Sequence, residues 1–144
     1  MDYNTFDEFE SVLYKLANGD KYQKKTDAPL ISPATYKTGT TRANSNVTAW
    51  GGFGIVDVDD YEGDIADIEK KYSQYRYVCY STASSTKERL KFRLVFPLTA
   101  EVPADKIKHF WYALNKEIGD IADAQTKDLS RMYYVPSQYK GAYN

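Results

Sequence analysis

Hydrophobic residues recur at helical spacing in two parts of the chain, where steps of three or four residues gather them on one helix face. In the first part they are Phe6, Phe9, Val12, Leu13 and Leu16. In the second part they are Ile107, Phe110, Trp111, Leu114 and Ile118. Thr5 and Glu8 form a capping-box pattern at the first series, and Gly19 follows it. Pro103 precedes the second series and Gly119 ends it. The pattern predicts two amphipathic helices.

Between these helices, short runs rich in apolar and β-branched residues are typical of strands. We expect strands at Gly51–Asp59, Arg76–Thr82 and Lys91–Leu98. A further short strand is expected at Arg131–Val135, directly before a proline. Asp64–Tyr72 has the spacing of a short helix.

The order of these elements predicts an α+β fold. From residue 51 onward it is a β-α-β-β-α-β unit, the ferredoxin-like or RNA-recognition-type arrangement around an antiparallel sheet. Residues 26–48 are polar and contain proline and glycine breakers, which predicts a long loop that is functional or flexible. We therefore expect a single domain over residues 1–144, with an N-terminal helix and basic loop in 1–50 and the core in 51–137.

Composition and charge exclude several kinds of site. His109 is the only histidine and Cys79 the only cysteine, which excludes histidine-based zinc sites, Ser-His-Asp triads and internal disulfides. The net charge of −1 is too acidic for a protein that sheathes double-stranded DNA, so nucleic-acid contacts should be local or weak. Lys21, Lys24 and Lys25 form a local basic loop. No apolar run approaches the ~20 residues of a membrane span and no signal-peptide pattern opens the chain, so we expect a cytoplasmic protein without a membrane partner.

Asp57 and Asp59 end the first predicted strand, in the segment FGIVDVDD. Residues two apart in a strand point to the same face, so the two carboxylates stand side by side. Such a pair is costly near a core unless a cation lies between its members, and Mg²⁺ or Mn²⁺ meets that need while keeping positions open for phosphates. The alternative is a strand that runs into an acidic turn. Asp60 faces the other side of a regular strand, although a bulge at the strand end inverts that assignment.

Basic residues accompany this pair in the same predicted sheet. Lys91 and Arg93 face one side of the third strand, and the first and third strands of such a unit are neighbours. Cations beside two carboxylates suit a metal-bound triphosphate, although strand cations also decorate solvated sheet faces. Asp123 and Arg131 lie near the start of the last strand and could bring a third carboxylate and another guanidinium to the same site.

Three motifs in order resemble those of archaeo-eukaryotic-type primases, in particular the primase-polymerase domains of phages and plasmids. Val56–Asp59 is similar to their first motif. Tyr80–Thr86 and the strand Lys91–Leu98 are similar to their second motif and the strand that follows it. Asp123 and then Asp128–Ser137 resemble their third motif and the Ser-Arg segment after it.

The resemblance implies a primase-polymerase catalytic core that performs template-directed nucleotidyl transfer on single-stranded DNA. Asp57, Asp59 and Asp123 would hold two catalytic Mg²⁺ or Mn²⁺ ions. The implied nucleotide-binding residues are Ser84, Ser85, Lys87, Lys91, Arg93 and Arg131. The implied partners are nucleoside triphosphates, a single-stranded DNA template, and a replicative helicase or an accessory priming domain, in the cytoplasm of a bacterial host.

The sequence departs from the family pattern in two ways. The second motif of these primases carries a histidine that contacts the nucleotide phosphates, and here Ser84 or Ser85 takes its place, with Lys87 or Arg89 able to compensate. Little chain after Ser137 remains for the helical accessory domain of many such primases. Two alternatives stay open: a degenerate relative that binds nucleotide or single-stranded nucleic acid without polymerising, and a phage-type interaction protein whose acidic strand end is only a turn.

Overall fold

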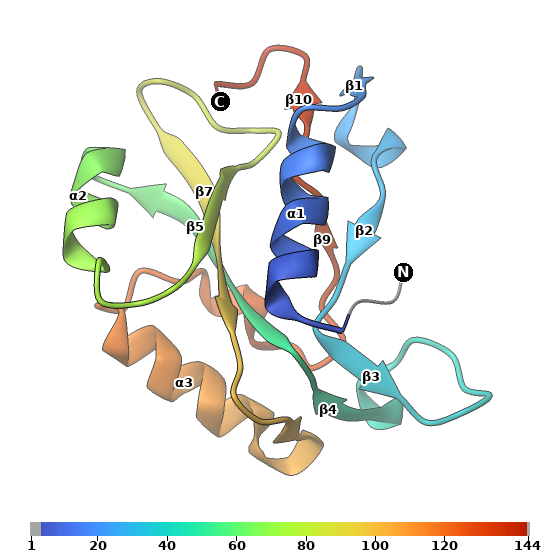
Figure 1. The fold of residues 1–144 in the computed structure, drawn as a ribbon. Coiled ribbons are helices and arrows are strands. Elements are labelled where there is room, and N and C mark those ends of the chain that lie inside the picture. The colour runs from blue at the N-terminus through green and yellow to red at the C-terminus, as the bar shows by residue number, and fades with distance from the viewer. Residues whose placement is uncertain (1–3, 144) are drawn as a thin grey trace.

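Three antiparallel strands form the central sheet of the computed structural model, which describes residues 4–143. They are β5 (Phe53–Tyr61), β7 (Leu90–Pro97) and β6 (Val78–Ser81), in the spatial order β5-β7-β6 (Figure 1). The first and third strands of the predicted unit are therefore neighbours, and the α+β class is confirmed. Alternate residues of each strand point to opposite faces, so each face of the sheet needs its own cover.

Helices α2 (Ile65–Lys71) and α3 (Ile107–Glu117) lie on one face of this sheet. The residues buried between them and the strands are Val56, Val58, Ile68, Tyr72, Phe92, Leu94, Phe96 and Ile118. Gly54 of β5 belongs to the same face, where a Cβ would meet Phe110 of α3 at 3.6 Å. The close approach of α3 to the sheet explains why a glycine suits this strand position.

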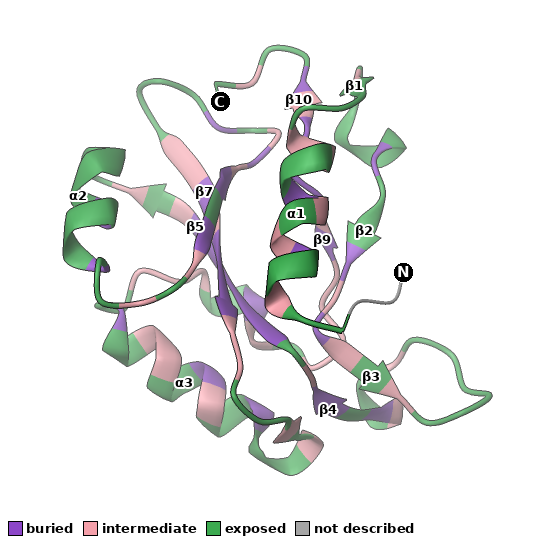
Figure 2. Ribbon diagram, viewed as in Figure 1, coloured by how far each residue is buried: buried purple, intermediate pink, exposed green. Residues whose placement is uncertain are grey.

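Helix α1 (Phe6–Ala17) covers the opposite face together with residues 133–139. Its Phe9 and Leu13 are almost wholly buried, and each such side chain contributes about 1.5–3 kcal/mol of hydrophobic stabilisation. The Thr5 side chain accepts a hydrogen bond from the Glu8 backbone N–H, as the capping-box pattern predicts. In Figure 2 the buried residues gather on β5 and β7, while the outer sides of the helices are exposed.

Short strands tie the N-terminal region to the rest of the chain. β1 (Lys21–Tyr22) pairs in parallel with β10 (Gln138–Tyr139), and β2 (Leu30–Ile31) pairs antiparallel with β9 (Tyr133–Tyr134). A second sheet has the order β3-β4-β8. Its strands are β3 (Ala34–Tyr36), β4 (Val47–Trp50) and β8 (Val102–Pro103). The chain also forms the 3₁₀ turns η1 (Lys25–Asp27), η2 (Asn44–Asn46), η3 (Ala104–Lys106) and η4 (Ala124–Lys127).

The prediction of one long loop over residues 26–48 is therefore wrong in part. β2, β3 and the start of β4 fall within it. β3 pairs with the neighbouring β4, whereas β2 pairs with β9 and β4 also pairs with β8. Strands of two to four residues show too few alternations for a sequence pattern to reveal them. Strand pairs also join residues on both sides of position 50, which was the expected boundary between the N-terminal region and the core.

The short strand expected at Arg131–Val135 is present, but its predicted place in the central sheet is wrong. Within residues 131–135 only β9 is a strand, and it pairs with β2 rather than with β5. The position beside β5 is taken instead by the segment after α3, because the Asp123 backbone N–H donates to the Asp57 carbonyl at 2.8 Å. This difference places Asp123 directly beside the end of β5.

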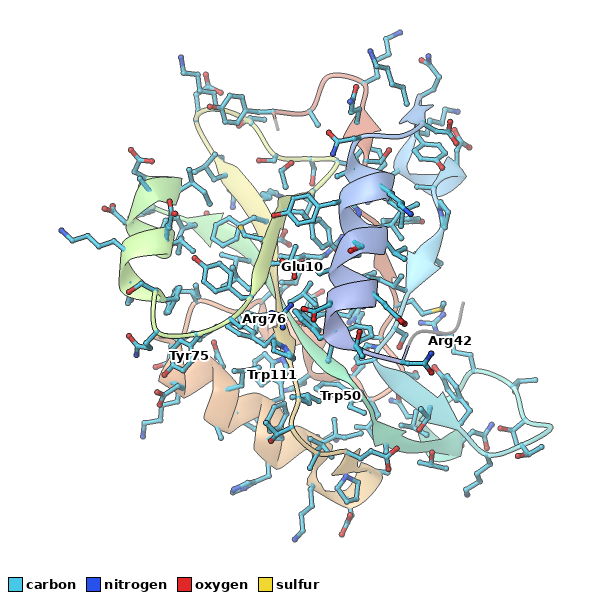
Figure 3. The ribbon with its side chains drawn as sticks, viewed as in Figure 1. Glu10, Arg42, Trp50, Tyr75, Arg76 and Trp111 are labelled. Carbon is cyan, nitrogen blue, oxygen red and sulfur yellow. The ribbon has the colours of Figure 1, made fainter. Side chains whose placement is uncertain are left out.

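Polar contacts fix α1 and the segment after α3 in place. Arg76, just before β6, pairs with Asp7 and with Glu10 of α1, and its Nη2 lies 2.8 Å from Glu10 Oε2 (Figure 3). On the other side, the indole N–H of Trp50 donates to the Leu129 carbonyl at 2.8 Å. Trp50 and Trp111 belong to one buried cluster between α3 and the second sheet. The Arg76 pairs thus hold α1 against the chain before β6, and the Trp50 hydrogen bond holds the chain that leads from η4 into β9.

Two surface properties of the fold bear on the sequence predictions. Cys79, the cysteine of the sequence analysis, is exposed on β6, which lies at the edge of the sheet. Across residues 4–143, none of the helices combines the length and the apolar character that a membrane crossing requires.

Candidate active site

Three carboxylates converge at the end of β5. Asp57 and Asp59 point to the same face of the strand, and Asp123 caps η4 from the segment bonded to β5. One carboxylate oxygen from each residue lies within 4.8 Å of the other two. Asp123 also accepts a hydrogen bond from the Gln125 backbone N–H, which fixes its side chain at the start of the turn. The strand and the cap thus bring together residues that are distant in sequence.

Arg93 holds Asp57 in position. The two residues are register partners on β7 and β5, and Arg93 Nε donates to Asp57 Oδ1 at 2.8 Å. Its Nη1 donates to the Tyr134 carbonyl at 2.9 Å. The guanidinium also lies 5.9 Å from the ring centroid of Tyr80 and 5.3 Å from that of Tyr133. The Arg93 guanidinium is therefore already bound to groups of the protein, so it is less available to a nucleotide than a cation without such partners.

The environment of Asp57 disfavours its ionised form. Burial raises the pKa of Asp57, and the neighbouring Asp59 and Asp123 act in the same direction, while Arg93 opposes them. One guanidinium therefore does not fully compensate the burial of Asp57 and its two acidic neighbours. Additional positive charge at this point would stabilise the cluster, as a divalent cation does when carboxylates are its ligands.

A polar cavity of about 340 Å³ opens beside the carboxylates. Its charged lining residues are Asp57, Asp59, Asp123, Lys25, Lys91, Arg93 and Arg131. Its uncharged polar lining includes Thr82, Ser84, Gln125 and Thr126. The cavity lining thus combines carboxylates with cations and hydroxyl groups. This combination suits a ligand that carries both a metal ion and phosphate groups.

The predicted cations Lys91 and Arg131 both line this cavity. Lys91 Nζ lies 4.0 Å from Asp59 Oδ1, which is a loose ion pair. Arg131 Nη2 donates to Asp128 at 2.9 Å and also contacts the Gln125 carbonyl. The Nε atom of Arg131 is buried without a hydrogen-bond partner in the described part of the chain. Each cation therefore keeps capacity for an anionic ligand.

Of the two serines and the lysine expected in the second motif, one residue lines the cavity and two do not. Ser84 is exposed and lines the cavity. Ser85 is 2% exposed, and its hydroxyl accepts a hydrogen bond from the Lys91 backbone N–H at 3.1 Å, so it stabilises the turn. Lys87 is exposed on the same turn and does not line the cavity. The structure therefore does not bring Ser85 or Lys87 to the carboxylates, because the turn directs them elsewhere.

Asp60 and Arg89 form a separate ion pair. Arg89 Nη2 lies 2.9 Å from Asp60 Oδ1, and both side chains are largely exposed. The pairing of β5 with β7 shifts register between Val58 and Tyr61, so an irregularity is present at this strand end. Asp59 nevertheless stays with Asp57, and Asp60 points to Arg89.

Lys25 and Thr82 are among the cavity residues that were not predicted as site residues. Lys25 was noted only as part of a basic loop, because nothing in the local sequence shows that η1 lies beside β5. Thr82 lies within Tyr80–Thr86, the segment that is similar to the second motif. The resemblance therefore pointed to this segment, but it did not distinguish Thr82 from its neighbours. His109, in contrast, is exposed on α3 and does not line the cavity.

Together these features define an α+β domain with a carboxylate cluster in a polar, cation-rich cavity. A family model of the VapE N-terminal domain matches residues 11–143. The chain therefore belongs to the VapE N-terminal domain family, a domain of phage and plasmid VapE-like replication proteins. A search of curated proteins and a search of solved structures each gave no match. The resemblance to archaeo-eukaryotic-type primases stays a prediction.

Proposed function

We propose that this domain is a primase-polymerase domain that performs template-directed nucleotidyl transfer on single-stranded DNA. The observation that carries the proposal is the convergence of Asp57, Asp59 and Asp123 within 4.8 Å beside a cavity that also holds cations. Membership of a replication-associated family agrees with this role. The substrates are nucleoside triphosphates and a DNA template, and a replicative helicase or an accessory priming domain is a further partner.

The three aspartates are the residues that would hold Mg²⁺ or Mn²⁺. When bound, such ions activate the 3′-hydroxyl of the growing strand and neutralise charge on the triphosphate and the leaving pyrophosphate. Burial and like charges already raise the pKa of Asp57, so the cluster fits a cation.

The remaining residues of the cavity position the substrate. Arg93 orients Asp57 through its 2.8 Å hydrogen bond, and we assign it mainly this positioning role. Lys91, Arg131 and Ser84 face the same cavity and are placed to contact triphosphate oxygens. Phosphoryl transfer depends chiefly on positioning and charge stabilisation, which these groups supply.

Primer synthesis on a single-stranded template tests this proposal. Wild-type protein with Mn²⁺ and nucleoside triphosphates should incorporate labelled nucleotide, and Asp59→Asn should lose at least about 100-fold in rate, because it removes a ligand charge. Asp60→Asn is the matched control, since Asp60 is the next residue and pairs with Arg89 instead. Equal losses in both variants, or no incorporation by the wild type, would count against the proposal.

A degenerate relative that binds nucleotide without polymerising it is the second candidate. It is favoured by the absence of histidine from the cavity lining and by the internal engagement of Arg93. Ser84→His is the variant that separates the two candidates, because Ser84 lines the cavity whereas Ser85 is buried in the turn. A wild type that is inactive but binds nucleotide, together with a gain of synthesis in Ser84→His, would support degeneracy.

A further inference from the structure

We propose that Lys25 binds the phosphate groups of the nucleotide and provides the positive charge that the second motif lacks. This inference rests on the proposed function, because it concerns the substrate of the same site. Residues 80–86 supply hydroxyl groups to the cavity but no cation. Lys25 comes from a distant segment and lines the same cavity as Ser84 and Thr82.

The fold holds the backbone of Lys25 at this place from both sides. Just before η1, β1 pairs with β10, and the Tyr22 carbonyl accepts a hydrogen bond from the Lys140 N–H at 3.1 Å. Just after η1, the Pro29 carbonyl accepts a hydrogen bond from the Val135 N–H at 3.1 Å, and β2 then pairs with β9. Both partner segments flank the cavity residues of β9. The position of Lys25 is thus set by the fold and not by a free loop.

Among the cations that line the cavity, Lys25 is also the one with the fewest ion pairs to other groups of the protein. Within residues 4–143 its ammonium group forms no ion pair, while Arg93 is bound to Asp57 and Arg131 to Asp128. Lys91 lies 4.0 Å from Asp59. A cation without a carboxylate partner, which lines a cavity that contains a candidate metal cluster, is suited to the outer phosphates of a metal-bound triphosphate.

Thr82 gives an independent indication of a ligand in this cavity. It is only 7% exposed, and its hydroxyl oxygen has no hydrogen-bond partner among the described residues. A buried hydroxyl without a hydrogen-bond partner destabilises the fold, so such groups usually serve a bound ligand or a function. Thr82 and Lys25 both line the cavity, so the hydroxyl group and the ammonium group can contact the same phosphate ligand there.

Titration with Mg²⁺·ATP and with Mg²⁺ plus inorganic triphosphate tests the inference, with Mn²⁺ binding in the absence of nucleotide measured in parallel. Lys25→Gln should weaken binding of both phosphate ligands about tenfold, since a charge-assisted contact is lost. Its Mn²⁺ affinity should stay close to that of the wild type. Lys25→Arg should retain binding, and Lys24→Gln is the matched control because Lys24 is exposed in the same loop and does not line the cavity.

The outcomes separate this inference from the proposed function. If Lys25→Gln binds triphosphate as well as the wild type, or if Lys24→Gln weakens binding equally, Lys25 has no specific role. If the wild type binds triphosphate through Lys25 but incorporates no nucleotide, the phosphate site stands and polymerisation falls. If the wild type binds neither metal nor triphosphate, both are overturned.

Discussion

Thr82 is the residue at which stability and ligand binding should separate most clearly. Its buried hydroxyl lacks a partner, so Thr82→Val should leave the melting temperature unchanged or raise it slightly. The same change should weaken Mg²⁺·triphosphate binding severalfold, because a donor to the ligand is lost. Thr126→Val is the control for stability: Thr126 is also a buried residue, but its hydroxyl donates to the Asp123 carbonyl at 2.6 Å. That variant should lose about 1 kcal/mol. A clear destabilisation by Thr82→Val would show that its hydroxyl has a structural role.

The buried Tyr80 should make the folded protein less stable at high pH. Burial raises the pKa of Tyr80 to about 12 in the folded protein, from an ordinary value of 10.0. Below pH 10 both the folded and the unfolded state keep the proton, so the full stability is present. As pH rises from 10 toward 12 the unfolded state releases its proton first, and the free energy of unfolding falls by roughly 1 kcal/mol per pH unit from this group.

Tyr80→Phe removes this group from the titration. The variant loses a hydrogen bond to the Tyr134 carbonyl, so it should be less stable at pH 8 by about 1 kcal/mol. Its stability should then decline less steeply than that of the wild type between pH 10 and 11. Urea unfolding at several pH values measures both effects, and identical slopes in the two proteins would contradict the assignment.

The sequence predicts which side chains share a site more reliably when they lie on one strand or on paired strands. It is less reliable for side chains that only the tertiary fold brings together. Asp57, Asp59, Lys91 and Arg93 share a face because strand geometry requires it. Asp123 was indicated only by its position shortly before the last predicted strand and by the resemblance to a family. Its place depends on a backbone hydrogen bond to β5 that no local pattern encodes.

At the scale of elements, the turn after α3 positions Asp123. Asn115 Oδ1 accepts a hydrogen bond from the Ala122 N–H at 2.9 Å, just before that aspartate. Asn115→Ala should therefore lower Mn²⁺ affinity about tenfold without removing a carboxylate, as supporting contacts of metal ligands do elsewhere. Lys116→Ala, at an exposed neighbouring position of α3, should leave the affinity unchanged. Equal affinity in the wild type and Asn115→Ala would show that this turn does not position the site.

The long elements could be predicted from sequence, together with the shorter α2 and β6, but most of the two-residue strands could not. β5, β7, α1 and α3 extend over eight or more residues, enough for their periodicity to be recognised. β1, β2, β9 and β10 have two residues each, and their partners lie across the chain. Their pairings decide where Lys25 lies, which is why this residue was missed as a candidate site residue.

At the scale of the whole molecule, the candidate site is assembled from segments around residues 25, 57–59, 82–93 and 123–134. Metal binding should therefore favour the folded state. At about 100 times its dissociation constant, Mn²⁺ should add ~2.7 kcal/mol of stability, or roughly 10 °C in melting temperature. EDTA should abolish the shift, and Asp59→Asn should show little of it. A shift of the same size in Asp59→Asn would place the metal elsewhere.

Calorimetric titration of Mn²⁺ into wild-type protein and Asp123→Asn tests most directly whether the distant carboxylates form one metal site. Asp120→Asn serves as the control, since Asp120 is exposed and adopts a φ of 58°, which asparagine tolerates. Wild type and Asp120→Asn should bind Mn²⁺ alike, and Asp123→Asn should bind at least about tenfold more weakly. Absence of binding to the wild type at millimolar Mn²⁺, or equal binding by all three proteins, would contradict the account.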